Sequence, residues 1–166
     1  MSTMESRRAH FMALHLRENT FFLPNPWDVG STKMMTALGV EALATTSAGY
    51  AFSTGKTSAV GEIEREEAMS HAKEIVGATH LPVSADLENG YGATPDEVAK
   101  TIEQAAKLGL NGACIEDTDL PSDQPYAFEK AVERVEAAVQ AARSAKSDFV
   151  LTARADGVML GTYDVA

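Results

Sequence analysis

The chain has 166 residues, of which 45% are hydrophobic and 23% charged, and its formal net charge at pH 7 is −10. These values are typical of a soluble globular protein, and the length predicts one domain, 1–166. The acidic balance and the lack of Lys/Arg clusters argue against nucleic acid or an anionic membrane as a partner. A single cysteine, Cys114, excludes an internal disulfide framework. No apolar run suits a membrane span or a signal peptide, so we expect a cytoplasmic protein.

Helical and strand-like segments alternate along the chain. We predict helices over 4–17, 30–38, 63–77, 95–107 and 127–145, and strands near 21, 42, 82–87, 112 and 149–156. The helix at 95–107 begins with a capping box, in which Thr94 is the N-cap and Glu97 the N3 residue. The strands are almost continuously apolar, as in parallel strands that are buried on both faces. This alternation predicts an α/β fold.

Polar side chains follow the expected strands at their carboxyl ends. They comprise Asp28, Ser47, Asp86 with Glu88, Glu116 with Asp117, and Arg154 with Asp156. In a (β/α)8 barrel these ends form the active-site face, and in an open doubly wound sheet they form the ligand crevice. Five segments that place charged or hydroxyl groups at the same end form a stronger signal than any single motif.

The stretch "PVSADLENGYG" carries the most specific chemistry. Since side chains alternate along a strand, we expect Asp86 and Glu88 to point to the same side, where two carboxylates require that one is protonated or that a cation lies between them. An all-oxygen site suits Mg2+ or Mn2+, and Glu116 could be a third ligand. Arg154 could bind a carboxylate or a phosphonate in bidentate fashion. The alternative is a strand end with solvated acids.

Five motifs in this order resemble the isocitrate lyase/phosphoenolpyruvate mutase superfamily: "LPNPWDVGS", "TTSAGYAFSTG", "PVSADLENGYG", "GACIEDT" and "LTARAD". The closest branch resembles phosphonomutase-like and methylisocitrate lyase-like proteins. The resemblance implies a Mg2+-dependent (β/α)8 barrel in a homo-oligomer, a dimer or a tetramer in the full-length form. It also implies lyase, mutase or hydrolase chemistry on a C–C or P–C bond of a small 2-oxo acid or phosphonate, through a pyruvate-like enolate held on the metal.

The resemblance also assigns roles to individual residues. Asp86, Glu88 and Glu116 match the metal ligands, for Mg2+ or Mn2+. Arg154 and Glu116 match the catalytic positions. The residues expected to bind substrate are Ser47, Ala48, Gly49, Asn89, Gly90 and Arg154.

Three departures from the family pattern bear on activity. The lyases proper carry a catalytic cysteine in a loop that here reads "DTDLPSDQPYAFEK", without Cys or His, and Cys114 is expected to be a small core residue. Ser58 stands where many members have an Asp. Only about five βα units are expected, so we interpret the chain as the N-terminal portion of an incomplete barrel. The alternative is an open five-stranded sheet.

The sequence therefore leaves three functional hypotheses. The leading one is the metal-dependent enzyme. The second is a non-catalytic truncated member or an assembly subunit, which the missing Asp near Ser58 favours. The third is a nucleotide-binding open sheet, suggested only by "GKTS" at 55–58, whose spacing from Gly49 is one residue too long for a P-loop.

Overall fold

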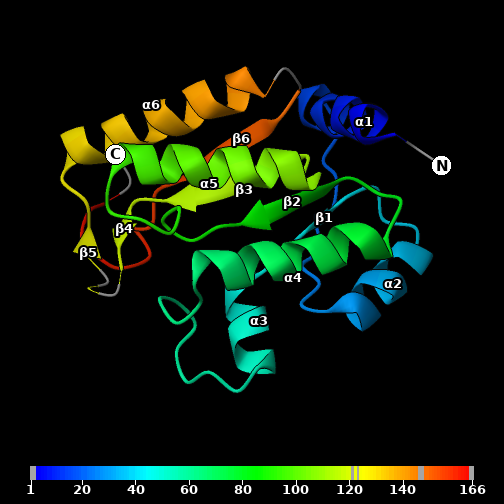
Figure 1. The fold of residues 1–166 in the computed structure, drawn as a ribbon, viewed down its shortest axis with the longest axis horizontal. Coiled ribbons are helices and arrows are strands. Elements are labelled where there is room, and N and C mark those ends of the chain that lie inside the picture. The colour runs from blue at the N-terminus through cyan, green and yellow to red at the C-terminus, as the bar shows by residue number, and fades with distance from the viewer. Residues whose placement is uncertain (1–2, 121, 123, 146–147, 165–166) are drawn as a thin grey trace.

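The computed structural model describes residues 3–120, 122, 124–145 and 148–164. Four parallel strands form one sheet in the order β1-β2-β3-β6, and a short antiparallel hairpin joins β4 to β5 (Figure 1). The helices are α1 (Met4–Leu16), α2 (Val29–Ala37), α3 (Ser47–Ser53), α4 (Arg65–Ala78), α5 (Pro95–Leu108) and α6 (Phe128–Ser144). The strands are β1 (Leu43–Ala44), β2 (Val83–Asp86), β3 (Gly112–Glu116), β4 (Thr118–Asp119), β5 (Gln124–Pro125) and β6 (Val150–Arg154).

The register of the parallel strands determines which side chains share a face. Asp86 pairs with Cys114, and Glu116 pairs with Arg154. Since paired residues of neighbouring strands lie on the same face and side chains alternate along a strand, these four side chains share one face of the sheet. The polar groups of β2, β3 and β6 are thereby collected toward one end of that face.

The opposite face of the sheet holds the main hydrophobic core. Figure 1 shows α4, α5 and α6 side by side across this face. The buried side chains of the core include Ile75, Val83, Ala85, Val98, Ile102, Ala113, Ile115 and Ala138. A second cluster forms where α1 packs Phe11 and Leu14 with Ala42 and against Val150. Burial of a large aliphatic side chain is worth about 1.5–3 kcal/mol, so these layers hold the sheet rigidly beneath its polar end.

Most of the predicted helices and their boundaries are confirmed. The N-terminal capping box of α5 is present, because Thr94 Oγ1 accepts from the Glu97 amide at 3.3 Å and Glu97 Oε2 accepts from the Thr94 amide at 3.0 Å. Gly39 and Gly109 adopt φ values of 84° and 108° at the ends of α2 and α5. Glycine adopts left-handed backbone without the steric cost that other residues incur, which explains why a glycine follows Leu38 and Leu108 at these helix ends.

Three features differ from the prediction. No strand forms near residue 21, because Pro24 and Pro26 lack the amide hydrogens that a sheet ladder needs. A single backbone bond, from the Ala44 amide to the Pro24 carbonyl at 3.1 Å, ties this segment to β1. The short helix α3 and the β4–β5 hairpin occupy segments predicted as loops. The α/β class with a parallel sheet is confirmed, but the described residues form four parallel strands rather than the five expected.

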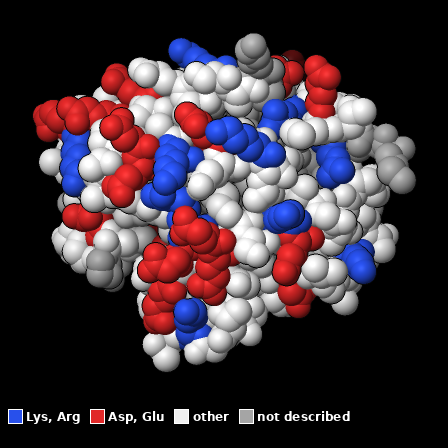
Figure 2. All heavy atoms as spheres, in the orientation of Figure 1, with Lys and Arg blue, Asp and Glu red and all other residues white. Residues whose placement is uncertain are grey.

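The surface carries mixed charge. On the face drawn in Figure 2, Lys and Arg side chains lie scattered among Asp and Glu rather than in one basic field. In the part of the chain that the structure describes, no helix combines the length and the apolar character that crossing a membrane requires.

Candidate functional site

Arg154, the last residue of β6, is the centre of an acidic cluster. Its Nη2 donates to Glu116 Oε2 and, at 2.9 Å, to Asp156 Oδ2. Its Nε donates to Asp156 Oδ1 at 2.8 Å, and its Nη1 lies 3.7 Å from Asp86 Oδ1. One guanidinium thus contacts three carboxylates, and those of Glu116 and Asp156 are buried. The predicted convergence of Asp86, Glu116 and Arg154 is therefore found.

Asp86 is oriented by the chain segment that follows β1. Its Oδ2 accepts from the backbone amide of Ser47 at 3.1 Å and from the Ser47 hydroxyl at 2.7 Å. Its own amide donates to Thr45 Oγ1 at 3.0 Å. The carboxylate of Asp86 consequently has one oxygen fixed by Ser47, while the other faces Arg154. Ser47, which was predicted to bind substrate, lies in direct contact with Asp86 through both its amide and its hydroxyl.

Glu88 does not occupy the position that strand alternation predicts. β2 ends at Asp86, and Glu88 lies in the left-handed region with φ 47°. Its side chain is almost fully buried, with 2% of the residue exposed, and its Oε2 accepts from the Gly61 amide at 3.1 Å. The two-residue period holds only while the chain remains a strand. The turn that begins after Asp86 therefore aims Glu88 toward the 54–64 loop.

Burial makes Glu88 an unusually weak acid. Desolvation raises the pKa of its carboxyl to about 7, and although the Gly61 amide and Arg154 favour the charged form, the nearby Asp86 carboxylate opposes it. A buried carboxyl with a pKa near neutrality is typical of functional sites. Its Oε1 has no hydrogen-bond partner among the described residues.

We expect Glu88 to make the folded protein less stable as pH rises. The folded state retains the Glu88 proton up to about pH 7, whereas an unfolded glutamate loses it at about pH 4.3. The folded state thus binds more protons between these values, and stability falls across that window. Allowing for solvent screening, Glu88→Gln should be more stable than the wild type by about 2 kcal/mol near pH 8 and similar near pH 5. Urea unfolding at both pH values measures this difference.

Glu103→Gln provides the control for this experiment, because Glu103 lies exposed on α5 and forms an exposed ion pair with Lys107. The wild type and this variant should show the same pH dependence. If Glu88→Gln also follows the wild-type curve from pH 5 to pH 8, Glu88 does not titrate within the folded protein.

The remaining predicted site residues lie in two turns. Ala48 and Gly49 form the first turn of α3 with Ser47, close to Asp86. Asn89 and Gly90 follow Glu88 in the turn after β2 and are buried. Cys114 lies within β3 on the face of Asp86 and is half-buried, and burial raises the pKa of its thiol. The sequence suggested that Cys114 is a core residue, but the structure leaves it only half-buried. Its raised pKa keeps the thiol protonated.

Two predicted residues lie apart from the cluster. Asp28 caps α2, where its Oδ1 accepts from the Ser31 amide at 2.6 Å and from the Ser31 hydroxyl at 2.7 Å. Ser58 is exposed and bonds within its own loop, with its amide donating to Glu62 Oε1 at 2.7 Å. The 54–64 loop nevertheless reaches the site, through Gly61 and Glu88.

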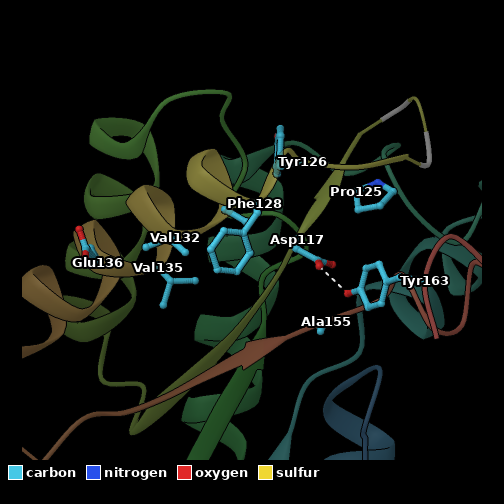
Figure 3. A pocket seen from close by; sticks show the side chains of 10 residues that line it. Asp117, Pro125, Tyr126, Phe128, Val132, Val135, Glu136, Ala155 and Tyr163 are labelled. Carbon is cyan, nitrogen blue, oxygen red and sulfur yellow. Dashed lines mark hydrogen bonds between the residues drawn. The ribbon is translucent and has the colours of Figure 1, made fainter. Parts of the chain in front are cut away.

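A cavity of about 620 Å³ lies beside the hairpin, between α6 and residues 155–163. Figure 3 shows Phe128, Val132 and Val135 on one side and Tyr163 on the other, with the Tyr163 hydroxyl bonded to Asp117 at 2.8 Å. None of the three carboxylates that contact Arg154 lines it. Since its walls are mainly apolar, this cavity does not suit a small dianion, and we assign the site to the Arg154 cluster. Asp117 fixes backbone here, because its Oδ1 accepts from the Asp156 amide at 2.8 Å.

Sequence reasoning missed several contributors to the site. It did not foresee that Thr45 and Ser47 orient Asp86, nor that Gly61 donates to Glu88. These contacts join segments that are far apart in the chain, so no local sequence pattern predicts them. Asp156, noted only as a strand-end acid, forms the two-point contact that orients Arg154.

Comparison with known proteins identifies the family. The family model of phosphoenolpyruvate phosphomutase matches residues 11–166. The chain belongs to the phosphoenolpyruvate mutase/isocitrate lyase superfamily. The resemblance inferred from the five motifs is thereby confirmed.

Relatives in this superfamily support both the fold and a broad chemical class. A lyase/mutase candidate from Burkholderia cenocepacia J2315 superposes with a TM-score of 0.91 and 46% identity, over 97% of this chain and 57% of the other. The structure of oxaloacetate acetylhydrolase in complex with its product oxalate superposes with a TM-score of 0.82 and 29% sequence identity. This match covers 94% of this chain and 56% of the other. A 2-methylisocitrate lyase from Halalkalibacterium halodurans is 28% identical over 149 residues, or 88% of this chain and 49% of that protein. The chain spans about half the length of these relatives.

No preformed metal cage is present in residues 3–120, 122, 124–145 and 148–164. Within them, no group of three or more His, Cys, Asp or Glu side chains is arranged to hold a metal ion. The reason lies in the contacts above, because Glu116 is held by Arg154 and Glu88 turns toward Gly61. The predicted ligands are therefore neighbours rather than a closed coordination shell.

Proposed function

We propose that this chain carries the active site of a lyase, mutase or hydrolase that acts on a C–C or P–C bond of a small 2-oxo acid or phosphonate and depends on Mg2+ or Mn2+. The observation that carries the proposal is the Arg154 cluster. It sets a guanidinium against Asp86, Glu116 and Asp156 at the carboxyl end of a parallel sheet. Superfamily relatives named for acting on methylisocitrate and oxaloacetate support the substrate class.

The donor set at this end of the sheet fits a hard divalent cation. The candidate ligands offer only carboxylate oxygens, which such ions prefer. Glu88 contributes a buried oxygen that lacks a partner among the described residues, as an absent ligand would leave it. We assign the ion to Asp86 and Glu88, with Glu116 acting through water. The bound ion would supply positive charge to a substrate oxygen on which negative charge develops.

The chain's own residues bind and orient the substrate in this proposal. Arg154 offers paired N–H donors to a carboxylate or phosphonate, and Glu116 and Asp156 hold its guanidinium in place. Ser47, Ala48 and Gly49 present the backbone of the first turn of α3 to the substrate carboxylate. Asn89 and Gly90 form the adjoining wall after β2. We also propose, from the resemblance, that the protein is a cytoplasmic homo-oligomer.

A thermal melt tests this proposal directly. Mg2+ and oxalate, a planar dianion that resembles a pyruvate enolate, should together raise the melting temperature more than either does alone. Ligand that binds only the folded state adds about 2.7 kcal/mol at 100 times its dissociation constant. A cooperative melt that does not respond to either additive would contradict the proposal.

A non-catalytic role is the second candidate function. One observation favours it: position 58 holds a serine, which provides no carboxylate and whose amide and hydroxyl bond within its own loop. In that case the protein should melt cooperatively but should bind neither Mg2+ nor oxalate.

A further inference from the structure

The turn after β2 has a backbone conformation that is unfavourable for two of its residues. Glu88 and Tyr91 have φ values of 47° and 53°, and Gly90 between them has 84°. Left-handed backbone is unfavourable for residues other than glycine and persists only where the surrounding structure enforces it. Something outside the turn must therefore hold the segment 88–91.

Three helices supply those restraints, each through one side chain to one of three successive carbonyl oxygens. From α6, Arg134 Nη2 donates to the Asn89 carbonyl. From α5, Thr101 Oγ1 donates to the Gly90 carbonyl at 2.7 Å. From α4, Arg65 Nη2 donates to the Tyr91 carbonyl at 2.5 Å. The sheet adds a fourth restraint, because the Glu116 amide donates to the Glu88 carbonyl at 2.9 Å.

Among these donors, Arg134 has the highest free-energy cost of burial. It is 2% exposed, and no described carboxylate lies within ion-pair distance of it. Its guanidinium lies 4.2 Å from the centre of the Tyr126 ring, and the Tyr126 hydroxyl accepts from Asn89 Nδ2 at 3.1 Å. A buried cation without a carboxylate partner is unfavourable, and its hydrogen bond to the Asn89 carbonyl and its contact with the Tyr126 ring offset part of that cost. Here both Arg134 and its aromatic neighbour contact the same residue of the turn.

We propose that Arg134 is a positioning residue, which together with Thr101 and Arg65 holds the 88–91 turn and with it Glu88. The Glu88 carboxylate accepts from the Gly61 amide, and the Glu88 amide donates to Asp86 Oδ1 at 3.4 Å. The inference rests on the proposed function, because it assigns to these residues the placement of a metal ligand. It extends that function to three residues on three helices, none of which contacts the Arg154 cluster itself. Groups that orient a ligand in this way typically change metal affinity 10–100-fold when they are replaced.

The test measures Mn2+ affinity of the full chain by electron paramagnetic resonance. Arg134→Met keeps the aliphatic stem and removes the donors, and Thr101→Val removes only a hydroxyl group. Both variants should raise the Mn2+ dissociation constant about 10-fold. Arg143→Met is the matched control, because Arg143 is an exposed arginine near the end of the same helix and should bind Mn2+ like the wild type. Thr101→Ser, which retains the hydroxyl, should restore most of the affinity.

Hydrogen exchange of the metal-free protein gives a second readout that does not depend on Mn2+. The Glu116 amide is bonded to the Glu88 carbonyl, so a loosened turn should speed its exchange in Arg134→Met and Thr101→Val. A purely structural role would lower the melting temperature but leave Mn2+ affinity and this local exchange unchanged in folded protein, which would overturn the inference. A wild type that binds no Mn2+ would refute the proposed metal site, and the exchange rates alone would then decide whether Arg134 positions the turn.

Discussion

Replacing Asp86 by asparagine is expected to weaken Mg2+ binding by about 100-fold or more, since it removes a direct ligand and outer-shell changes alone cost 10–100-fold. The new amide can still accept from Ser47, which fixes Asp86 Oδ2. Its NH2 group would then face Arg154, where Asp86 Oδ1 now lies 3.7 Å from Nη1. The substitution thus preserves size and replaces a negative charge by donors at the point where a cation must approach. Isothermal titration with Mg2+ measures the change.

Asp148→Asn is the control for this measurement. Asp148 is exposed and precedes β6, at the end of the strand opposite to Arg154. It removes the same charge from the chain without touching the cluster, and it should bind Mg2+ as the wild type does. Equal Mg2+ affinity in Asp86→Asn and the wild type would place the ion elsewhere or exclude it.

Arg154→Met should be the most destabilising single change in the cluster, with a loss of about 3 kcal/mol in the free energy of unfolding. The side chains of Glu116 and Asp156 are only 3% and 8% exposed, so removing the guanidinium leaves two buried carboxylates unpaired. Mg2+ should restore part of the loss, because the acids would then attract a replacement cation. Urea unfolding with and without Mg2+ measures both effects.

Arg17→Met is the matched comparison. Arg17 also makes a two-point contact with a carboxylate, since its Nη1 and Nη2 each lie 2.7 Å from Glu41, but both side chains are substantially exposed. An exposed pair contributes only about 0–1 kcal/mol, and Mg2+ should not affect it. If both variants lose the same stability, the Arg154 cluster contributes no more than an ordinary surface ion pair.

Local rules account for the parts of the fold that the sequence predicted well. The capping box at Thr94 and the glycines at the helix ends act within a few residues, and these boundaries are confirmed. Apolar runs located β2, β3 and β6 for the same reason. The strand near residue 21 was wrong because the apolar pattern of "TFFLPN" outweighed the missing amides of the prolines, and neither α3 nor the hairpin has a strong local signal.

The candidate site was predictable only in outline. The topology of parallel strands brings strand ends together, so the meeting of Asp86, Glu116 and Arg154 followed from their positions alone. The position of Glu88 did not, because strand alternation fails where the backbone turns left-handed after Asp86. The partners of the turn, including Arg134 and Gly61, come from segments whose approach depends on the complete tertiary fold.

The two outer strands of the sheet differ in a way that affects how molecules meet one another. Along β1, the segment before α2 covers the edge, with Ala44 bonded to the Pro24 carbonyl and to Asn25 Nδ2. β6 pairs with β3 on one side and ends the strand order, and Thr152 and Ala153 on it are exposed. Such an edge is a template for another strand. Among the described residues, the edge of β6 is therefore open to pairing with a further strand, whereas the edge of β1 is covered.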